Sequence, residues 1–384
     1  MSRPWQQVTG LVFVWAVALT MRAGEKQNPQ WNAGSFAVLM RQALRGDRRA
    51  QLRVGMAFEK GETVPQNPTE AVRWFSEAAV AGDSHAQHNL GVMLYRGAGV
   101  ERNVAEAAKW FEKAAAAGLP EAQFNAGCFY ERGLGVPQNL GRALALYQEA
   151  ARRGLAPAQN NLGKMYEKGE GIARDPVAAV GWFTKSAEQG NSIGEFDLGA
   201  MYWNGSGVPK DSGKAVYWFE RAAQQGYALA QLMLGLFYRD GLGVPQDDQA
   251  AVTWLLKAAQ QGNADAQNKL GIVYLQGQGV IADAARAGVW FSRAAEQGDR
   301  AAQANLAALY ETGRGVPRDL MQAYRWYLLS QRGSHTDRSD ELRQLANLMS
   351  AEQIAVAERM ATEWRTAQTR ARGTALAQLT DLLE

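Results

Sequence analysis

Two histidines have a spacing that could form a metal-binding site. His85 and His88 lie three positions apart, so on a helix both imidazoles would face one side and could share a metal ion. No third ligand is evident beside them, and the chain has three histidines in all. We therefore expect an ordinary pair of surface residues and no metal site.

The motifs of nucleophilic and phosphate chemistry are missing from the sequence. It contains no Gly-x-Ser-x-Gly elbow, no Gly-x-x-x-x-Gly-Lys-Ser/Thr loop and no His-Glu-x-x-His helix. The recurrent Gly-x-Gly pairs lack the third glycine and the preceding strand of a dinucleotide site. A net charge of +3 does not favour a nucleic-acid partner either. We expect no catalytic residues, no cofactor and no enzymatic activity.

The dominant pattern is a unit of 36 residues that occurs eight times without insertion. A glycine-like position and a mostly tryptophan position recur in register, as Gly55, Gly91, Gly127, Gly163, Gly199, Gly235, Gly271 and Ala307, and as Trp74, Trp110, Leu146, Trp182, Trp218, Trp254, Trp290 and Trp326. Self-similarity at such a period predicts stacked repeats, each burying its apolar face against its neighbours.

Each unit is predicted to fold as two helices, A and B. In the second unit we expect helix A at 84–96 and helix B at 104–117. Gly97 stands where a left-handed residue would end helix A, and Asn103 stands where a side chain would cap helix B. Both positions recur in all eight units. In helix B, Trp110 and Phe111 share a stripe with three alanines, which favours core packing over a stacking platform for bases or sugars.

These residues resemble the Sel-1-like repeat, a relative of the tetratricopeptide repeat. The match is fullest over 231–262, with Gly235, Tyr238, Gly241, Trp254 and Gly262 in place, and it extends over about three quarters of the chain. Departures include Thr63, Leu146 and the pair Ser330-Gln331. The resemblance implies an all-α, right-handed α-solenoid of eight helix-turn-helix repeats that acts as a protein-interaction scaffold or adaptor. Many members of that family are exported bacterial proteins.

The ends of the chain differ from the repeats. We expect an amino-terminal capping helix at 32–46, the eight repeats at 47–334 and carboxyl-terminal capping helices at 335–384, with a capping box at Ser350–Gln353 opening the last helix. Within residues 1–23, Arg3 is followed by a short apolar run, and this pattern is typical of a signal peptide. This predicts a periplasmic or secreted protein; the alternative is tethering to a membrane by an uncleaved segment.

One enzymatic alternative follows from the same resemblance. Some cysteine-rich exported proteins with such repeats are described as penicillin-binding or β-lactamase-like hydrolases. Cysteine pairs join their repeats, whereas this chain has the single cysteine Cys128. The resemblance therefore does not extend to that group.

Variable positions of helix A indicate where a partner could bind. In tetratricopeptide-like arrays these positions line the concave groove, and in the fifth to seventh units they are unexpectedly apolar, whereas the fourth unit carries Asn160, Lys164 and Glu167. We call the apolar set the A-helix strip and expect it to bind a protein or peptide; it comprises Ile193, Phe196, Trp203, Leu229, Leu232, Leu236, Ile272 and Leu275. Packing between neighbouring A helices remains the alternative, and the sequence does not define the oligomeric state.

Overall fold

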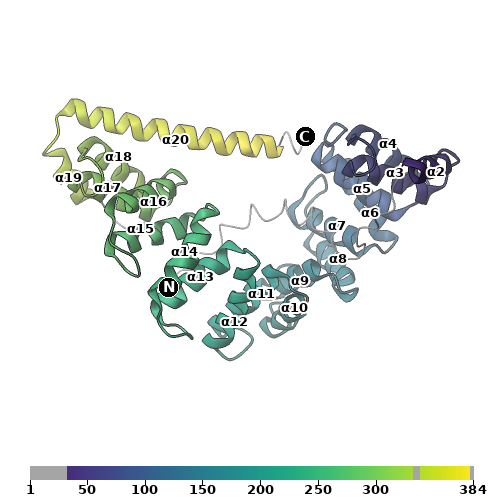
Figure 1. Ribbon diagram of the computed structural model, residues 1–384, viewed down its shortest axis with the longest axis horizontal. Helices are drawn as coiled ribbons and strands as arrows, with labels where there is room; N and C mark the ends of the chain where they lie inside the picture. The colour runs from purple at the N-terminus through teal and green to yellow at the C-terminus, as the bar shows by residue number, and fades with distance from the viewer. Residues whose placement is uncertain (1–32, 332–337, 381–384) are drawn as a thin grey trace. The chain divides into compact units, whose positions relative to one another are not determined.

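The computed structural model describes residues 33–331 and 338–380, and in these ranges it contains helices α2 to α20 and no strand (Figure 1). The A helices are α3 (Arg48–Lys60), α5 (Ser84–Arg96), α7 (Pro120–Arg132), α9 (Ala156–Lys168), α11 (Ser192–Asn204), α13 (Ala228–Asp240), α15 (Ala264–Gln276) and α17 (Arg300–Thr312). The B helices are α4 (Pro68–Val80), α6 (Val104–Ala116), α8 (Leu140–Arg152), α10 (Pro176–Glu188), α12 (Ser212–Gln224), α14 (Asp248–Gln260), α16 (Ala284–Glu296) and α18 (Leu320–Gln331). The predicted all-α repeat architecture is thereby confirmed.

Three further helices flank the repeats: α2 (Ala33–Leu44), α19 (Ser339–Ala346) and α20 (Ala351–Thr380). The chain divides into two compact units, with the boundary in the sequence within α10, between Ser186 and Ala187. The first unit contains α2 to α9 and the end of α20 from Ala375, and the second contains α11 to α19 with α20 as far as Thr374. The predicted leader at 1–23 lies outside the described residues.

Caps recur at both ends of the helical hairpin. The glycine after each A helix is left-handed, with φ between 64° and 78°. The Asn or Asp before each B helix accepts a hydrogen bond from the backbone N–H three residues later, at 2.9–3.1 Å. These bonds satisfy amides that a helix start leaves unpaired. Both predicted caps are therefore confirmed.

The residue after the tryptophan position of helix B is buried in every repeat; it is phenylalanine in five repeats, tyrosine in two and leucine in one. Phe111 and Phe219 are buried, and each lies against the glycine of its own helix A. A Cβ atom on Gly91 would stand 2.8 Å from the ring of Phe111, and one on Gly199 would stand 2.8 Å from Phe219. Glycine is therefore required at these two positions because the aromatic ring occupies the space of a side chain.

The neighbouring tryptophan column is less buried than the sequence suggests. Trp110, Trp182, Trp218, Trp254 and Trp290 are half-buried. Each carries the Lys or Arg three residues later over its ring, at 3.8–5.1 Å from the centroid. The sequence predicts that both aromatic residues of helix B fill the core. This holds fully only for the phenylalanine position, because one face of each interior tryptophan is covered by a cation instead of by the core.

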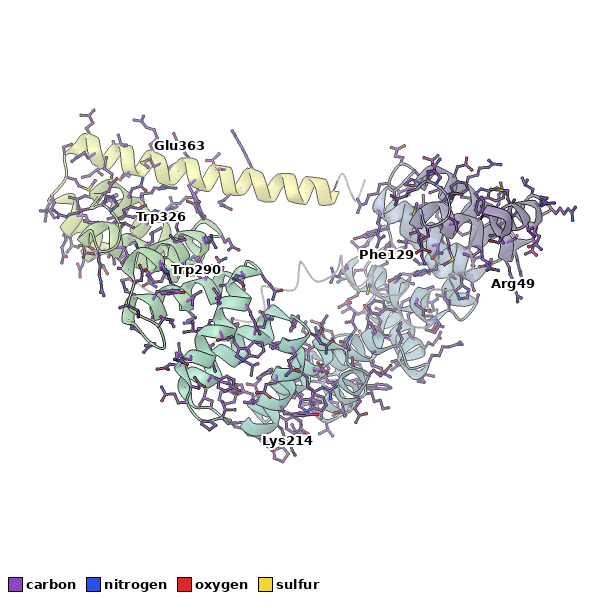
Figure 2. All side chains as sticks on the ribbon, viewed as in Figure 1. Arg49, Phe129, Lys214, Trp290, Trp326 and Glu363 are labelled. Carbon is purple, nitrogen blue, oxygen red and sulfur yellow. The ribbon has the colours of Figure 1, made fainter. Side chains whose placement is uncertain are left out.

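The terminal helices bury the tryptophans at the two ends of the array. Trp74 is 2% exposed and packs with Leu39 of α2. Trp326 is also 2% exposed and meets Trp364 of α20 at 6.1 Å (Trp326 is labelled in Figure 2). The capping box that opens α20 is present, since Gln353 and Ser350 exchange side-chain hydrogen bonds with each other's backbone N–H. α20 begins directly after this box, at Ala351, and continues to Thr380.

A glutamine near the start of helix A ties each repeat to the preceding B helix. Its side-chain amide donates to the carbonyl eight residues earlier, at 3.0–3.4 Å, in seven repeats. In the fifth repeat Glu195 takes this position and instead accepts from Arg221 (2.9 Å) and Gln225 (2.7 Å). Burial raises the pKa of the Glu195 carboxyl, and Arg221 opposes that rise.

The two histidines do not form the expected surface pair. His85 is exposed, but His88 is 7% exposed and its Nε2 lies 2.9 Å from the Asn125 amide of the next repeat. Burial lowers the pKa of His88 below its ordinary 6.5, and the hydrogen bond with Asn89 opposes that change. The side chain therefore joins two A helices as a neutral imidazole.

We expect His88→Asn to remove an acid-dependent loss of stability. Because the pKa of His88 is lower in the folded chain, the unfolded chain takes up protons first, and stability falls as the pH drops below about 6.5. Asparagine preserves the contact, as Asn268 does when it accepts from Asn305 at 2.9 Å. Urea unfolding on both sides of that pH measures the difference. His85→Asn serves as the control and should retain the loss; an unchanged loss in His88→Asn would contradict the assignment.

Candidate partner-binding site

All eight residues of the A-helix strip lie on three successive A helices of the second unit. α11 carries Ile193, Phe196 and Trp203; α13 carries Leu229, Leu232 and Leu236; α15 carries Ile272 and Leu275. Their positions repeat because each repeat advances the chain by 36 residues without insertion. The strip therefore belongs to one compact unit.

Burial divides the strip into a floor and a set of partly accessible residues. Leu232 is 1% exposed and packs with Leu255 and Leu270, so it is a core residue and not a contact. The other seven side chains are half-buried. Local packing thus accounts for part of the apolar character, and each of the seven retains some accessible surface.

Phe196 and Trp203 are held by aromatic contacts with the core. Phe196 lies 5.4 Å from Phe219 and 5.2 Å from Tyr227, measured between ring centroids. Trp203 lies 4.7 Å from Phe237, and Lys210 stands 4.5 Å from the Trp203 ring. These contacts fix the two rings in place. They also mean that truncating either ring would disturb the core.

Ile193 and Leu229 occupy the first turns of α11 and α13. The equivalent residue of the next repeat, in α15, is Asp265, and that of the third repeat is Glu121 in α7. An acidic side chain is stabilised near the amino end of a helix, where backbone N–H groups are unpaired. The fold therefore accepts either an apolar or an acidic residue here.

A polar hollow adjoins the strip at Ile272. It has a volume of about 460 Å³ and is lined by Arg239, Asp240, Gln246, Asp248, Ile272, Val273, Gln276 and Gln278. Arg239 donates twice to Asp240, at 2.6 and 2.8 Å, and this pairing lowers the pKa of the carboxyl. The hollow thus offers amide groups and a paired charge beside an apolar side chain.

Two features of this region were missed from the sequence alone. The hollow has no repeating signature, because its residues come from several elements: α13, the turn after it, the start of α14, α15 and the turn after α15. Glu195 had a signature, since seven of eight repeats place glutamine there, and comparison of the columns would have found it.

Metal and membrane sites can be assessed for the described residues. No three His, Cys, Asp or Glu side chains among them gather closely enough to hold a metal ion. None of the helices in the described ranges is both long and apolar enough to cross a bilayer.

Comparison with known proteins places the chain among repeat proteins of one family. The Sel1 repeat model matches residues 48–83, 84–119, 120–155, 156–191, 192–227, 228–263, 264–299 and 300–330. A Sel1 repeat protein from Oxalobacter formigenes is similar at 32% identity, with a TM-score of 0.61, over 86% of this chain and 93% of that one. The comparison with curated proteins gave no match.

A second solved structure is similar over most of its length. The protein c5321, a protective antigen of uropathogenic Escherichia coli with an SLR fold, is 29% identical, with a TM-score of 0.55, over 89% of this chain and 90% of that one. The family model covers far more than half of the sequence, and the resemblance inferred from the motif is confirmed. The chain belongs to the Sel1 repeat family.

Proposed function

We propose that this protein is an interaction scaffold that binds a peptide or helix of a partner protein along the A-helix strip. Sel1 repeat proteins are generally protein-interaction scaffolds, and the fold is typically non-enzymatic. The observation that carries the proposal is the run of partly accessible apolar residues on three successive A helices. The fourth repeat places Asn160, Lys164 and Glu167 at equivalent positions, so the fold does not require apolar residues in all of them.

The strip fits recognition of an apolar segment with polar surroundings. Half-buried side chains already fixed by core contacts lose little conformational entropy on binding, which favours affinity. The hollow beside Ile272 supplies side-chain amides that can bond to a peptide backbone. An amphipathic helix or an extended peptide with spaced apolar residues would satisfy both features.

We also propose that the protein acts outside the cytoplasm. Support comes from Arg3 and the apolar run from about Val8 to Met21, which has the length and charge of a secretory leader. Tethering by an uncleaved segment is the alternative. Fractionation of a Gram-negative host with amino-terminal sequencing distinguishes the two, and a cytosolic product with its native amino terminus would contradict both.

Leu229→Asp should weaken binding while the fold remains intact. The change places an acidic residue where the next repeat has Asp265, so the melting temperature should stay nearly constant. Peptides selected from a displayed library against the full chain provide the ligands, and fluorescence titration measures their affinity. We expect a loss of at least tenfold in affinity, about 1.4 kcal/mol or more.

Val289→Asp is the matched control for this test. Val289 is 52% exposed on α16 in the same unit and lies outside the strip. Its substitution should leave the affinity unchanged. If the selected peptides bind both variants as they bind the original chain, the strip is a packing feature and the partner site lies elsewhere.

A further inference from the structure

The first helix of the array carries an exposed face that mixes arginines with aliphatic residues. The buried side of α2 packs on α3 through Leu39 and Ala43 (Figure 1). The remaining surface of the helix carries four exposed residues, namely Val38, Arg41, Leu44 and Arg45. Val38 is 48% exposed and Leu44 is 66% exposed, which is unusual for side chains of this size.

The start of α3 and the end of α4 extend this surface. Gln51 of α3 donates to a carbonyl in the last turn of α2 at 3.3 Å and to the carboxylate of Glu77 in the last turn of α4 at 3.1 Å. Arg48 donates to the carbonyl of Ala81 at 3.4 Å, and the preceding residue, Val80, is 79% exposed. The ends of the three helices therefore lie together. We call the four exposed residues of α2 together with Arg48, Arg49 and Val80 the amino-terminal patch.

The arginines of the patch retain hydrogen-bond donors for a ligand. Arg45 and Arg49 form no ion pair with any described residue. Arg41 donates to the carbonyl of Ala37 in its own helix, and Arg48 bonds to a backbone carbonyl. A guanidinium group has five N–H donors, so one such bond leaves most of them available.

The acidic side chains beside the patch are already engaged. Asp47 caps α3, where it accepts from two backbone N–H groups at 2.9 and 3.1 Å. Glu77 accepts from Gln51 and lies 3.5 Å from Arg73. Between residues 33 and 58 the chain has five arginines, and Asp47 is its one acidic residue. The patch therefore has a clear excess of positive charge.

We propose that the amino-terminal patch docks on a membrane surface that contains anionic phospholipids. The planar guanidinium group of arginine matches a phosphate headgroup, and basic residues close to an anionic bilayer are attracted to it. Leu44 and Val80 enter the boundary between headgroups and acyl chains, where burial removes them from water. This inference goes beyond the proposed function, because the patch lies on the first unit and the A-helix strip lies on the second.

The exposed aliphatic residues favour a bilayer over other polyanions. Nucleic acid or free phosphate would bind the arginines but would leave Leu44 and Val80 in water. The patch also contains no aromatic side chain on which a base could stack. A bilayer is the anionic surface that offers an apolar layer directly beneath its charges.

A dye on α2 measures contact of this face with a bilayer. Gln42 is exposed, and in full-length Gln42→Cys an environment-sensitive dye labels this site alone, because Cys128 is buried. Vesicles of equal parts phosphatidylcholine and phosphatidylglycerol should shift the emission to shorter wavelength. Vesicles of phosphatidylcholine alone should bind at least tenfold more weakly. Added salt should weaken binding to the mixed vesicles, because it screens the charges.

Two variants of the labelled protein separate charge from apolar contact. The charge variant carries Arg45→Gln and Arg49→Ala, which are the residues at the equivalent positions Gln261 and Ala301. The apolar variant carries Leu44→Gln and Val80→Gln, as at Gln224 and Gln260. Because other repeats carry these residues, both variants should keep the melting temperature. We expect the charge variant to bind mixed vesicles at least tenfold more weakly and the apolar variant at least threefold more weakly.

Matched controls remove the same kinds of side chain elsewhere in the first unit. Arg152→Gln with Arg153→Gln removes two exposed arginines at the end of α8, and Val177→Gln removes a valine that is 66% exposed. Both controls should bind mixed vesicles as the original chain does. Equal losses in the arginine control and the charge variant would mean that overall charge drives binding and would reject the patch.

Three other results would overturn the proposal. The first is the absence of an emission shift with mixed vesicles. The second is a charge variant or an apolar variant that binds them as tightly as the original chain. The third is a shift of the dye by duplex DNA or polyglutamate at the same affinity, since this would assign a general polyanion site in place of a lipid surface.

Discussion

Phe219→Ala should lower the free energy of unfolding of the repeats around it by about 3–5 kcal/mol. Phe219 is 1% exposed, and its ring centroid lies 5.5 Å from that of Phe237 and 5.4 Å from that of Phe196. The ring also fills the space opposite Gly199, where no side chain can replace it. Truncation therefore leaves a cavity between α11 and α12. Denaturant unfolding followed by circular dichroism measures the loss.

Trp218→Ala is the control for this substitution. From the sequence, the tryptophan position is expected to be core, and its truncation to cost as much. The structure shows Trp218 half-buried, with Arg221 over its ring at 5.1 Å. We therefore expect a clearly smaller loss than for Phe219→Ala. Equal losses for the two variants would show that the tryptophan is as deeply packed as the phenylalanine.

Gly99→Ala should cost about 3 kcal/mol or more, because two penalties combine. Gly99 has φ of 73°, a conformation that residues with a side chain resist. A Cβ atom would also stand 2.2 Å from the carbonyl carbon of Pro68 and 2.5 Å from the nitrogen of Thr69. Backbone atoms cannot yield as a side chain does. The turn of the second repeat would separate from the first turn of α4.

Gly154→Ala isolates the conformational part of that cost. Gly154 has φ of 91°, and a Cβ atom there would meet nothing within 4 Å. This variant should lose only about 1–2 kcal/mol. Melting curves of the two proteins provide the comparison. A loss of the same size in both would mean that contact between repeats at Gly99 contributes nothing.

The amino-acid sequence alone determined the architecture, because local rules act identically in each repeat. A glycine that ends helix A and an Asn or Asp that caps helix B recur every 36 residues, and each was found in its predicted role. The bounds of α5 and α6 differ from the predicted ones by at most one residue. These features depend on neighbours a few residues away, which the sequence specifies directly.

Tertiary structure decided which residues are buried, and this changed the interpretation of individual side chains. Adjacent aromatic residues in helix B point in different directions, so Phe219 is core while Trp218 keeps one face under a cation. His88 is buried because the A helix of the next repeat brings Asn125 against it, and Leu232 is the floor of the strip for a similar reason. Contacts between repeats join residues about 36 positions apart. The distance at which neighbouring repeats pack decides how much of each side chain is buried, and no short motif encodes that distance.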